Sequence, residues 1–363
     1  MRLRELFLLE QGLVFLNHGS FGACPRPVFE EYQRLQLELE RQPVAFLGRE
    51  RRFPELIDAA RERLAAYVGA DPANLVFVPN ATSGVNVVAR SVELAPGDEV
   101  LASDHEYGAL DYLWEHVCGK AGASYVRVPP DELVGSLGPR TRVLFVSHVT
   151  SKTALRLPVE ELVEAARSAG VLSVVDGAHA PGHLPLSLEE LGADAYTGNC
   201  HKWLCAPKGS GFLHVAPGLQ AQIEPLVVSW DWGEARTFAE RHRYHGTSDP
   251  ASYLAVPAAI DFQAEHGWDE VRTRCAALAE RARVEIASLF GVEPFPPQGL
   301  QMVSVPLPPC DPARVQRRLL EERLIEVPCF EHEGRPTIRV SFQGYNDEAD
   351  LERLLEALPS ALS

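Results

Sequence analysis

What the sequence lacks already limits the classes of protein to which it can belong. No apolar run in its 363 residues approaches the ~20 residues that a membrane helix requires. Positive charge is scarce, since 34 lysines and arginines stand against 50 aspartates and glutamates and give a formal net charge of −16. A chain this acidic, with no basic stripe, repels a nucleic-acid backbone. We therefore expect a protein that binds neither nucleic acid nor membrane.

The first twelve residues, MRLRELFLLEQG, do not read as a signal peptide. They carry two arginines, and their short apolar stretch is broken by Glu5. We expect an amphipathic helix at this end of the chain.

The cysteines are too scattered for a disulfide framework. Their number is odd, and the chain is long enough to bury a core without covalent links. We expect reduced thiols and a cytoplasmic protein. The cysteines are Cys24, Cys118, Cys200, Cys205, Cys275, Cys310 and Cys329.

The middle of the chain alternates β-rich and helical segments. Near-continuous apolar strands separated by helices are typical of a mostly parallel sheet with helices on both faces. We therefore expect an α/β fold in which one large seven-stranded sheet occupies residues 74–260. The expected strands are 75–78, 99–103, 124–128, 142–147, 171–176, 194–199 and 211–215, with helices at 82–92, 107–121, 159–169 and 187–191.

The two ends of the chain have a different pattern. Helical spacing dominates residues 25–68, with a break at Pro43 and a second helix at about 52–68. After Pro257 we expect one long helix over 258–289, and then a small α+β unit. That unit contains the segment 300–307, a helix at 311–323, a strand at 337–342 and a helix at 346–358. The expected organisation is an N-terminal segment 1–24 that joins the small domain, a helical region 25–73, a large domain 74–260 and a small domain 261–363.

The residues that follow the strands carry the chemistry, because ligands of open α/β sheets bind beyond the carboxyl ends of the strands. After the first strand, Asn80 to Gly84 place small and hydroxyl side chains at the start of a helix. Such a start is either a phosphate site or a plain helix cap. Neither GxxxxGK[ST] nor GxGxxG follows a strand, so we expect neither a Walker loop nor a dinucleotide loop.

Ionisable residues stand at or after the ends of two further strands. Asp176 is the last residue of one strand, and Lys202 follows the next. A carboxylate at the end of a buried strand requires a cationic partner, such as a protonated heterocyclic nitrogen. A lysine at a strand tip can lose its charge by desolvation and become a nucleophile. A helix start, an aspartate and a lysine, in this chain order, fit pyridoxal phosphate. Lys152 and Lys208 are rivals, but they lie in a loop and in a glycine-rich turn.

Six segments of the chain carry a family resemblance: ATSGVN, SDHEYGA, VVDGAHAPGH, GNCHKWLCAPKGSGFL, HGTSDPASYLAVPAAI and TIRVSFQGYNDEADLERLLEAL. In this order they resemble the class V aminotransferase family of fold-type I pyridoxal-phosphate enzymes. Two more, LNHGSFGACPRPV and CHKWLCAPKG, resemble its isopenicillin N epimerase-like branch, to which the cysteine desulfurases and C–S lyases are near relatives. The resemblance extends from Leu16 to about Leu358.

The resemblance implies roles in cofactor binding. Lys202 would form the Schiff base and carry the proton at the substrate Cα, while Asp176 would pair with the pyridine nitrogen. His179 would donate a hydrogen bond to the phenolic oxygen of the ring, where many desulfurases have glutamine. The phosphate would be held by Thr82, Ser83, Asn199 and His201.

The resemblance also implies roles around the substrate. Tyr107 would stack on the cofactor ring, and Arg339 would bind the substrate carboxylate through two parallel hydrogen bonds. Asn17 and His18 would lie near the substrate, and Tyr107 or His18 would serve as a second acid. Thr247 would reach the phosphate of a neighbouring subunit, so that a homodimer shares its active sites.

Some positions depart from the family pattern or leave alternatives open. Ser151 stands seven residues before Pro158, where desulfurases usually carry an asparagine. Cys329 lies three or four residues before the place of their mobile nucleophilic cysteine, so we interpret it as a partly buried thiol. His105 is an alternative ring stacker to Tyr107, and His18 is also explained as a histidine that satisfies loop backbone groups.

No metal site is expected. His179 and His183 lie four residues apart and Cys200 and Cys205 five apart, but neither a C-x-x-C pair nor H-E-x-x-H occurs. Three loops (16–24, 41–52 and 229–236) would read the substrate side chain. The pair Trp230 and Trp232 fits either a substrate loop or a dimer interface.

The sequence thus predicts a pyridoxal-phosphate enzyme of amino-acid metabolism that forms a carbanion at the substrate Cα. The favoured reactions are epimerisation and C–S lysis of a sulfur-containing amino acid, the latter including desulfurase-like chemistry. The sequence does not separate them from transamination. A second hypothesis is a binding module without turnover. The presence of Lys202, Asp176 and Arg339 together argues against it.

Overall fold

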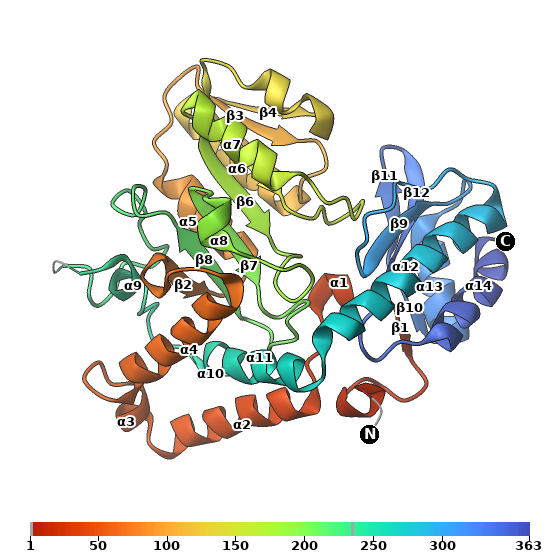
Figure 1. Cartoon of the computed structure of the whole chain (residues 1–363), viewed down its shortest axis with the longest axis horizontal. Coiled ribbons are helices and arrows are strands. Elements are labelled where there is room, and N and C mark those ends of the chain that lie inside the picture. Colours follow the sequence, from red (N-terminus) through yellow and green to blue (C-terminus); the bar gives the residue numbers. More distant parts are fainter. Residues whose placement is uncertain (1–2, 234–235) are drawn as a thin grey trace. The chain divides into compact units, whose positions relative to one another are not determined.

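The computed structural model describes residues 3–233 and 236–363, and they form two units (Figure 1). The large unit contains residues 28–150 and 156–261. The small unit contains residues 1–27, 151–155 and 262–363. The chain passes between them within helices α2 (Arg26–Arg41) and α11 (Val256–Glu265) and at both ends of the 151–155 segment. The small unit is therefore built from both ends of the chain.

The large unit is organised around a seven-stranded sheet of order β2-β8-β7-β6-β5-β3-β4. Only β8 runs antiparallel to its neighbours, so the expected mostly parallel α/β sheet is confirmed. In the register, Ser147 lies opposite Asp176, which in turn lies opposite Thr197. The strands are β2 (Leu75–Val78), β3 (Glu99–Ser103), β4 (Ser124–Val128), β5 (Thr141–Ser147), β6 (Leu172–Gly177), β7 (Ala195–Asn199) and β8 (Gly211–Val215).

Helices cover both faces of this sheet (Figure 1). On one face α5 (Ala81–Ser91) and α6 (Gly108–Ala121) bury an apolar cluster in which the Trp114 and Phe145 rings lie 5.7 Å apart. α7 (Val159–Ala169) packs against β6, and the short α8 (Leu188–Leu191) packs against α7. Gly84 in α5 faces Thr197 of β7 so closely that any Cβ would collide with the threonine side chain. This close approach places the start of α5 beside the end of β7.

The helices of the N-terminal region belong to the large unit. The expected break at Pro43 separates α2 (Arg26–Arg41) from α3 (Pro43–Leu47), and α4 (Arg52–Val68) ends at Gly69 in the left-handed conformation. Three further helices follow the sheet: α9 (Phe238–Arg241), α10 (Ala251–Leu254) and α11 (Val256–Glu265).

The small unit combines two sheets with four helices. β9 (Met302–Pro306), β12 (Arg335–Ser341) and β11 (Cys329–His332) are antiparallel, while β1 (Val14–Phe15) pairs in parallel with β10 (Ile325–Glu326). Thus the N-terminal segment is joined by hydrogen bonds to a strand more than 300 residues later in the sequence. The helices are α1 (His18–Phe21), α12 (Trp268–Phe290), α13 (Pro312–Arg323) and α14 (Glu348–Leu362).

Two expected helices differ in the structure. From Leu3 onward the N-terminal segment forms only a 3-10 turn, Leu3–Leu6, instead of an amphipathic helix. Tertiary contacts take precedence there, because Arg4 pairs with Asp350 and Phe7 packs edge-on against Tyr345 at 4.8 Å.

The single helix expected over 258–289 is two helices, α11 and α12. Gly267 lies between them with φ +58°, a left-handed conformation that interrupts a right-handed helix and that glycine adopts at little cost.

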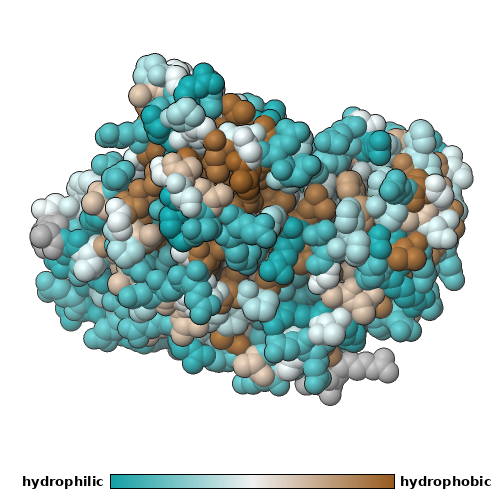
Figure 2. Space-filling view, turned by 45° about the horizontal axis from the view of Figure 1, so that its top comes forward, coloured by the Kyte–Doolittle hydropathy of each residue, from teal (hydrophilic) through white to brown (hydrophobic). Residues whose placement is uncertain are grey.

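The surface agrees with the composition. Figure 2 shows hydrophilic residues over most of the visible face, with smaller apolar areas between them. Within the described ranges, no helix combines the length and the apolar character needed to cross a bilayer.

Candidate active site

The carboxyl ends of β5, β6 and β7 bring several polar side chains of the large unit together. Asp176 at the end of β6 is 4% exposed, and its Oδ1 accepts a hydrogen bond from the Ala178 N–H at 2.8 Å. Burial raises the pKa of this carboxyl above its ordinary value. A carboxylate in such a position is stabilised by an adjacent cation. A protonated ring nitrogen of a cofactor therefore fits this site.

Lys202 follows β7 and reaches a histidine from the neighbouring loop. Its Nζ lies 3.1 Å from Nε2 of His179, and the opposite ring nitrogen of His179 accepts a hydrogen bond from the Trp203 indole at 3.2 Å. His179 and Trp203 are both buried. Lys202 and His179, which were each expected to contact the cofactor, thus contact each other. The rivals Lys152 and Lys208 are both exposed.

Packing and hydrogen bonds hold the loop that carries His179. The ring of His183 stacks on Trp203 at 4.1 Å, and its Nδ1 donates to the His179 carbonyl at 3.0 Å. Gly182 has φ +83°, and a Cβ there would collide with the backbone of Trp203 and Leu204. The loop therefore lies directly on the turn that contains the lysine.

The start of α5 has fewer available N–H groups than its sequence suggests. The Asn80 side chain caps the helix and accepts from the Ser83 N–H at 2.9 Å. The side-chain oxygen of Asn199, a residue expected to hold a phosphate, accepts from the Ala81 N–H at 2.8 Å. Asn199 thus joins the end of β7 to the helix. The Thr82 and Ser83 side chains, both partly exposed, lie in this first turn.

His201 is half-buried next to Lys202. Its Nδ1 donates to the Ser210 carbonyl at 2.9 Å, and burial lowers its pKa to about 4. At neutral pH the ring is therefore uncharged, and Nε2 is an acceptor. A phosphate group would be bound by this nitrogen only after the ring takes up a proton.

Sequence reasoning missed Glu106. This residue is 4% exposed, and its two carboxyl oxygens form hydrogen bonds with Ser103 Oγ and with Ser147 Oγ, the latter at 2.5 Å. Burial raises its pKa to about 8, so the side chain is protonated at neutral pH. The signal was present in the sequence, because Glu106 closely follows a buried strand, as Asp176 ends one.

The two candidate ring stackers flank Glu106. Tyr107 is the N-cap residue of α6 and is 46% exposed, and its backbone carbonyl accepts from two amides of the first helical turn. His105 is partly buried, with Nε2 3.6 Å from the Asp104 carboxylate. Tyr107 thus presents an accessible ring beside the carboxyl ends of the strands.

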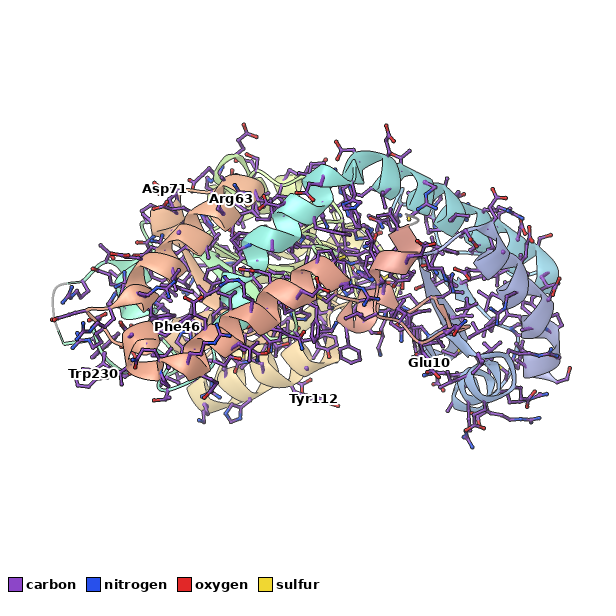
Figure 3. The ribbon with its side chains drawn as sticks, turned by 90° about the horizontal axis from the view of Figure 1, so that it is seen from below. Glu10, Phe46, Arg63, Asp71, Tyr112 and Trp230 are labelled. Atoms are coloured by element: carbon purple, nitrogen blue, oxygen red, sulfur yellow. The ribbon has the colours of Figure 1, made fainter. Side chains whose placement is uncertain are left out.

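Thr247 lies in a different part of the large unit. It is exposed and lines a cavity of ≈ 330 Å³ with residues that include Arg49, Trp230 and Tyr244. The Arg49 guanidinium lies 4.8 Å above the Trp230 ring and pairs with Asp231 at 2.5 Å. Figure 3 shows Trp230 projecting from its loop. Residues 234–235 of the expected substrate loop lie outside the described residues.

The small unit contains the expected carboxylate-binding residue. Arg339 on β12 is 5% exposed and donates to the Ser151 carbonyl at 2.5 Å, to the Ser151 hydroxyl at 3.3 Å and to the Ser20 hydroxyl at 2.8 Å. These three acceptors, a carbonyl and two hydroxyls, orient the guanidinium group. Ser151, which departs from the family pattern, therefore orients Arg339.

Asn17 and His18 are tied into the small unit. Asn17 donates to the Glu326 carboxylate at 2.9 Å. His18 is fully buried, with its ring nitrogens 2.9 Å from the Tyr345 hydroxyl and 3.2 Å from the Gln343 side chain. This geometry favours the structural interpretation of His18 over a second acid.

Curated relatives match the chain over almost its whole length. It is 42% identical to isopenicillin N epimerase of Amycolatopsis lactamdurans, over 98% of this chain and 96% of the relative. Identity is 40% with isopenicillin N epimerase of Streptomyces clavuligerus, with the same coverage. A putative L-cysteine desulfhydrase of Oryza sativa is 29% identical over 96% of this chain and 83% of the relative.

Solved structures agree on the fold. The cysteine desulfurase CsdA from Escherichia coli matches with a TM-score of 0.85 and 25% identity, covering 99% of this chain and 97% of that one. A C-DES variant with glycine covalently linked to its PLP cofactor matches with a TM-score of 0.87 and 24% identity, over 98% of both chains.

A family model ties these similarities together. The model described as Aminotransferase class-V matches residues 23–354. With the epimerase relatives, this match confirms the resemblance to the family and to its isopenicillin N epimerase-like branch. The chain therefore belongs to the class V aminotransferase family and is a pyridoxal-phosphate-dependent enzyme.

Proposed function

We propose that this enzyme removes the proton from the Cα of an amino acid and returns it on the opposite face, so that it epimerises its substrate. The observation that carries the proposal is the Lys202–His179 contact of 3.1 Å beside the buried carboxyl of Asp176. The 42% identity to an isopenicillin N epimerase supports the choice of epimerisation and makes isopenicillin N the first substrate to test.

The residues of the large unit fit the cofactor. Asp176 is suited to hold the proton of the ring nitrogen, and His179 to donate to the phenolic oxygen. Tyr107 is the proposed ring stacker, because its side chain is the accessible one. The phosphate contacts proposed are Thr82, Ser83 and His201, while Asn199 supports the helix start that carries the first two.

The chain's own groups then divide the proton chemistry. When bound, the cofactor draws electron density away from the substrate Cα, which makes the Cα proton removable. Lys202 would be the base that takes this proton. An acid on the other face must return a proton. We assign that role to the Tyr107 hydroxyl, since His18 is buried between Tyr345 and Gln343.

Arg339 is proposed to bind the substrate carboxylate. Its guanidinium is already oriented by Ser151 and Ser20, so little side-chain entropy is lost when a carboxylate binds. Asn17 and the start of α1 belong to the same unit and are proposed to lie near the substrate.

We also propose a homodimer in which Thr247 contacts the cofactor phosphate of the neighbouring subunit. Support comes from the exposed apolar side chains near its cavity: Val227 is 45% exposed, Val228 58% and Trp230 62%. Such a surface is typical of an interface. All seven cysteines lack a disulfide bond, which favours a reducing compartment such as the cytoplasm.

C–S lysis is the second candidate, and the similarity to L-cysteine desulfhydrases favours it. Desulfurase chemistry has less support, because it requires a thiolate. Cys329 is 7% exposed, and burial raises its pKa to about 12, so that it stays a thiol at neutral pH.

The experiment is to incubate the holoenzyme in deuterated water with isopenicillin N and, separately, with L-cysteine. Epimerisation predicts one deuterium at Cα and both configurations at that carbon. Pyruvate and sulfide from L-cysteine, without epimer formation from isopenicillin N, would replace the proposal with C–S lysis. Enzyme that binds the cofactor but exchanges no Cα proton in either substrate would contradict both reactions.

A further inference from the structure

Trp203 makes a directional contact with His179. It is fully buried, and its indole nitrogen lies 3.2 Å from Nδ1 of His179. An indole N–H can only donate a hydrogen bond. Nδ1 of His179 must therefore accept, so this nitrogen carries no proton.

This acceptor role decides the protonation state of the whole imidazole. A ring protonated at Nδ1 would point its N–H at the indole N–H, and a doubly protonated ring would do the same. The remaining state is the neutral ring with its proton on Nε2. Trp203 thus selects one of the three states that a histidine can adopt.

The consequence extends to Lys202. The Nε2–H of His179 faces Nζ of Lys202 at 3.1 Å, and a hydrogen bond between them requires Nζ to accept. An ammonium group has no lone pair, whereas an uncharged amine does. The amine is also the form that attacks a carbonyl carbon.

The surroundings keep Trp203 in this orientation. Its ring stacks on His183 at 4.1 Å with an interplanar angle of 23°, and His183 in turn donates to the His179 carbonyl. The turn after Lys202 is closed by a hydrogen bond from the Cys205 N–H to the Lys202 carbonyl at 3.0 Å. The indole is therefore fixed from both sides, and its N–H has a defined direction.

We propose that Trp203 is a positioning residue that fixes His179 as the Nε2–H tautomer and thereby keeps Lys202 in its uncharged, nucleophilic form. In the proposed function the same Nε2–H then serves the phenolic oxygen of the cofactor. Only this contact with the phenolic oxygen rests on the proposed function. The tautomer and the state of the lysine are properties of the protein without cofactor.

The direct test uses cofactor-free protein labelled with ¹⁵N in its histidines. Nitrogen chemical shifts distinguish the two tautomers, and we expect His179 to carry its proton on Nε2. Trp203→Phe removes the N–H but keeps a ring to stack on His183, and we expect Nδ1–H to become populated. Nitrogen shifts that place the proton on Nδ1 of His179 in the unaltered protein would overturn the proposal, whether or not the variant folds.

A matched control is available in the same unit. Trp114 is also fully buried, and its indole nitrogen has no hydrogen-bond partner within the described ranges. Trp114→Phe should leave the His179 tautomer unchanged. An equal change in both variants would show that the loss of any buried indole is responsible, and would contradict the proposal.

The second test measures the reactivity of Lys202 itself. The chain has four lysines, and Lys120, Lys152 and Lys208 are exposed internal references for labelling by trinitrobenzenesulfonate. In cofactor-free protein at neutral pH, Trp203→Phe should slow the labelling of Lys202 about two- to tenfold, the scale of one net hydrogen bond. An unchanged rate would contradict the link from Trp203 to Lys202.

A double variant separates this role from a merely structural one. Glutamine has no tautomers, so in a His179→Gln background Trp203→Phe should change the Lys202 labelling rate less than twofold. The same large effect in both backgrounds would show that Trp203 acts by packing alone. None of these measurements requires cofactor or turnover, so their failure is distinct from the failure of the epimerase proposal.

Discussion

Two parts of the large unit differ in how far their side chains are buried and fixed by contacts within the chain. Around Lys202 the polar groups are fixed by the chain itself. Trp203 is fully buried and donates a hydrogen bond to His179, which is 2% exposed and contacts the lysine. In the segments 226–230 and 246–248, by contrast, several side chains face solvent, with Trp230 62% exposed and Thr247 exposed.

The difference shows which functions the single chain can carry alone. The Lys202 region has its donors and acceptors arranged before any ligand binds, so catalysis there needs little reorganisation. The segment around Trp230 and Thr247 leaves apolar surface exposed, and its proposed role needs a second copy of the chain. The following predictions test the two halves of this contrast.

The largest effect is expected at Lys202. Lys202→Ala should reduce Cα proton exchange by roughly 10³-fold or more, because the base and its hydrogen-bond partner are lost together. It should also abolish the ~420 nm band of the bound cofactor. Lys208→Ala, at an exposed site six residues on, is the control and should keep both. Persistence of the band in Lys202→Ala would show that another lysine holds the cofactor.

Arg339 in the small unit resembles the Lys202 region in being buried and oriented by hydrogen bonds. Arg339→Lys keeps the charge but cannot form two parallel hydrogen bonds to a carboxylate. We expect KM to rise about tenfold or more with a smaller change in kcat, since one bidentate contact is lost. Arg335→Lys, exposed on the same strand, should leave KM unchanged. An unaltered KM in Arg339→Lys would remove this residue from the substrate site.

Glu106 makes the stability of the buried region depend on pH, because burial raises the pKa of its carboxyl from 4.5 to about 8. Between pH 4.5 and about 8 the folded state therefore keeps a proton on Glu106 that the unfolded state has lost. The free energy of unfolding falls as pH rises through this window. Glu106→Gln removes this dependence. Its free energy of unfolding relative to the parent should increase by up to about 1 kcal/mol per pH unit across the window.

Urea unfolding at several pH values measures this difference. Glu115→Gln, at an exposed position on α6, is the control and should show no such slope. A difference between Glu106→Gln and the parent that does not change with pH would mean that Glu106 is ionised in the folded protein.

The smallest effect is expected at the exposed segment. Trp230→Ala should weaken self-association about five- to tenfold, the contribution of one aromatic side chain at an interface. Sedimentation equilibrium measures this. Tyr112→Ala on α6, 76% exposed and labelled with Trp230 in Figure 3, should leave association unchanged. A parent protein that is monomeric at all concentrations would contradict the proposed dimer.

Hydrophobic periodicity was sufficient to predict the strands of the large unit, and the residues at strand ends were sufficient to propose the Lys202 region as the site. The seven strands lie within one residue of their expected positions at either end, because buried parallel strands are apolar throughout and flanked by helices. Asp176 and Lys202 were proposed as site residues by the rule that ligands bind beyond strand ends.

What the sequence did not reveal depends on tertiary partners. Trp203 has no local signal for its contact with His179, which lies on another loop. The prediction of an N-terminal helix was wrong because Arg4 and Phe7 contact residues more than 300 positions away. Asn199 supports α5 because Gly84 lets that helix approach β7, a fact of packing that no motif expresses.

The central claim is that the Lys202 region binds the cofactor. Borohydride reduction of the holoenzyme, followed by peptide mass spectrometry, fixes the cofactor to the residue that holds it. The account predicts a phosphopyridoxyl group on the peptide that contains Lys202 alone. Modification of Lys120, Lys152 or Lys208, the other lysines of the chain, would contradict it.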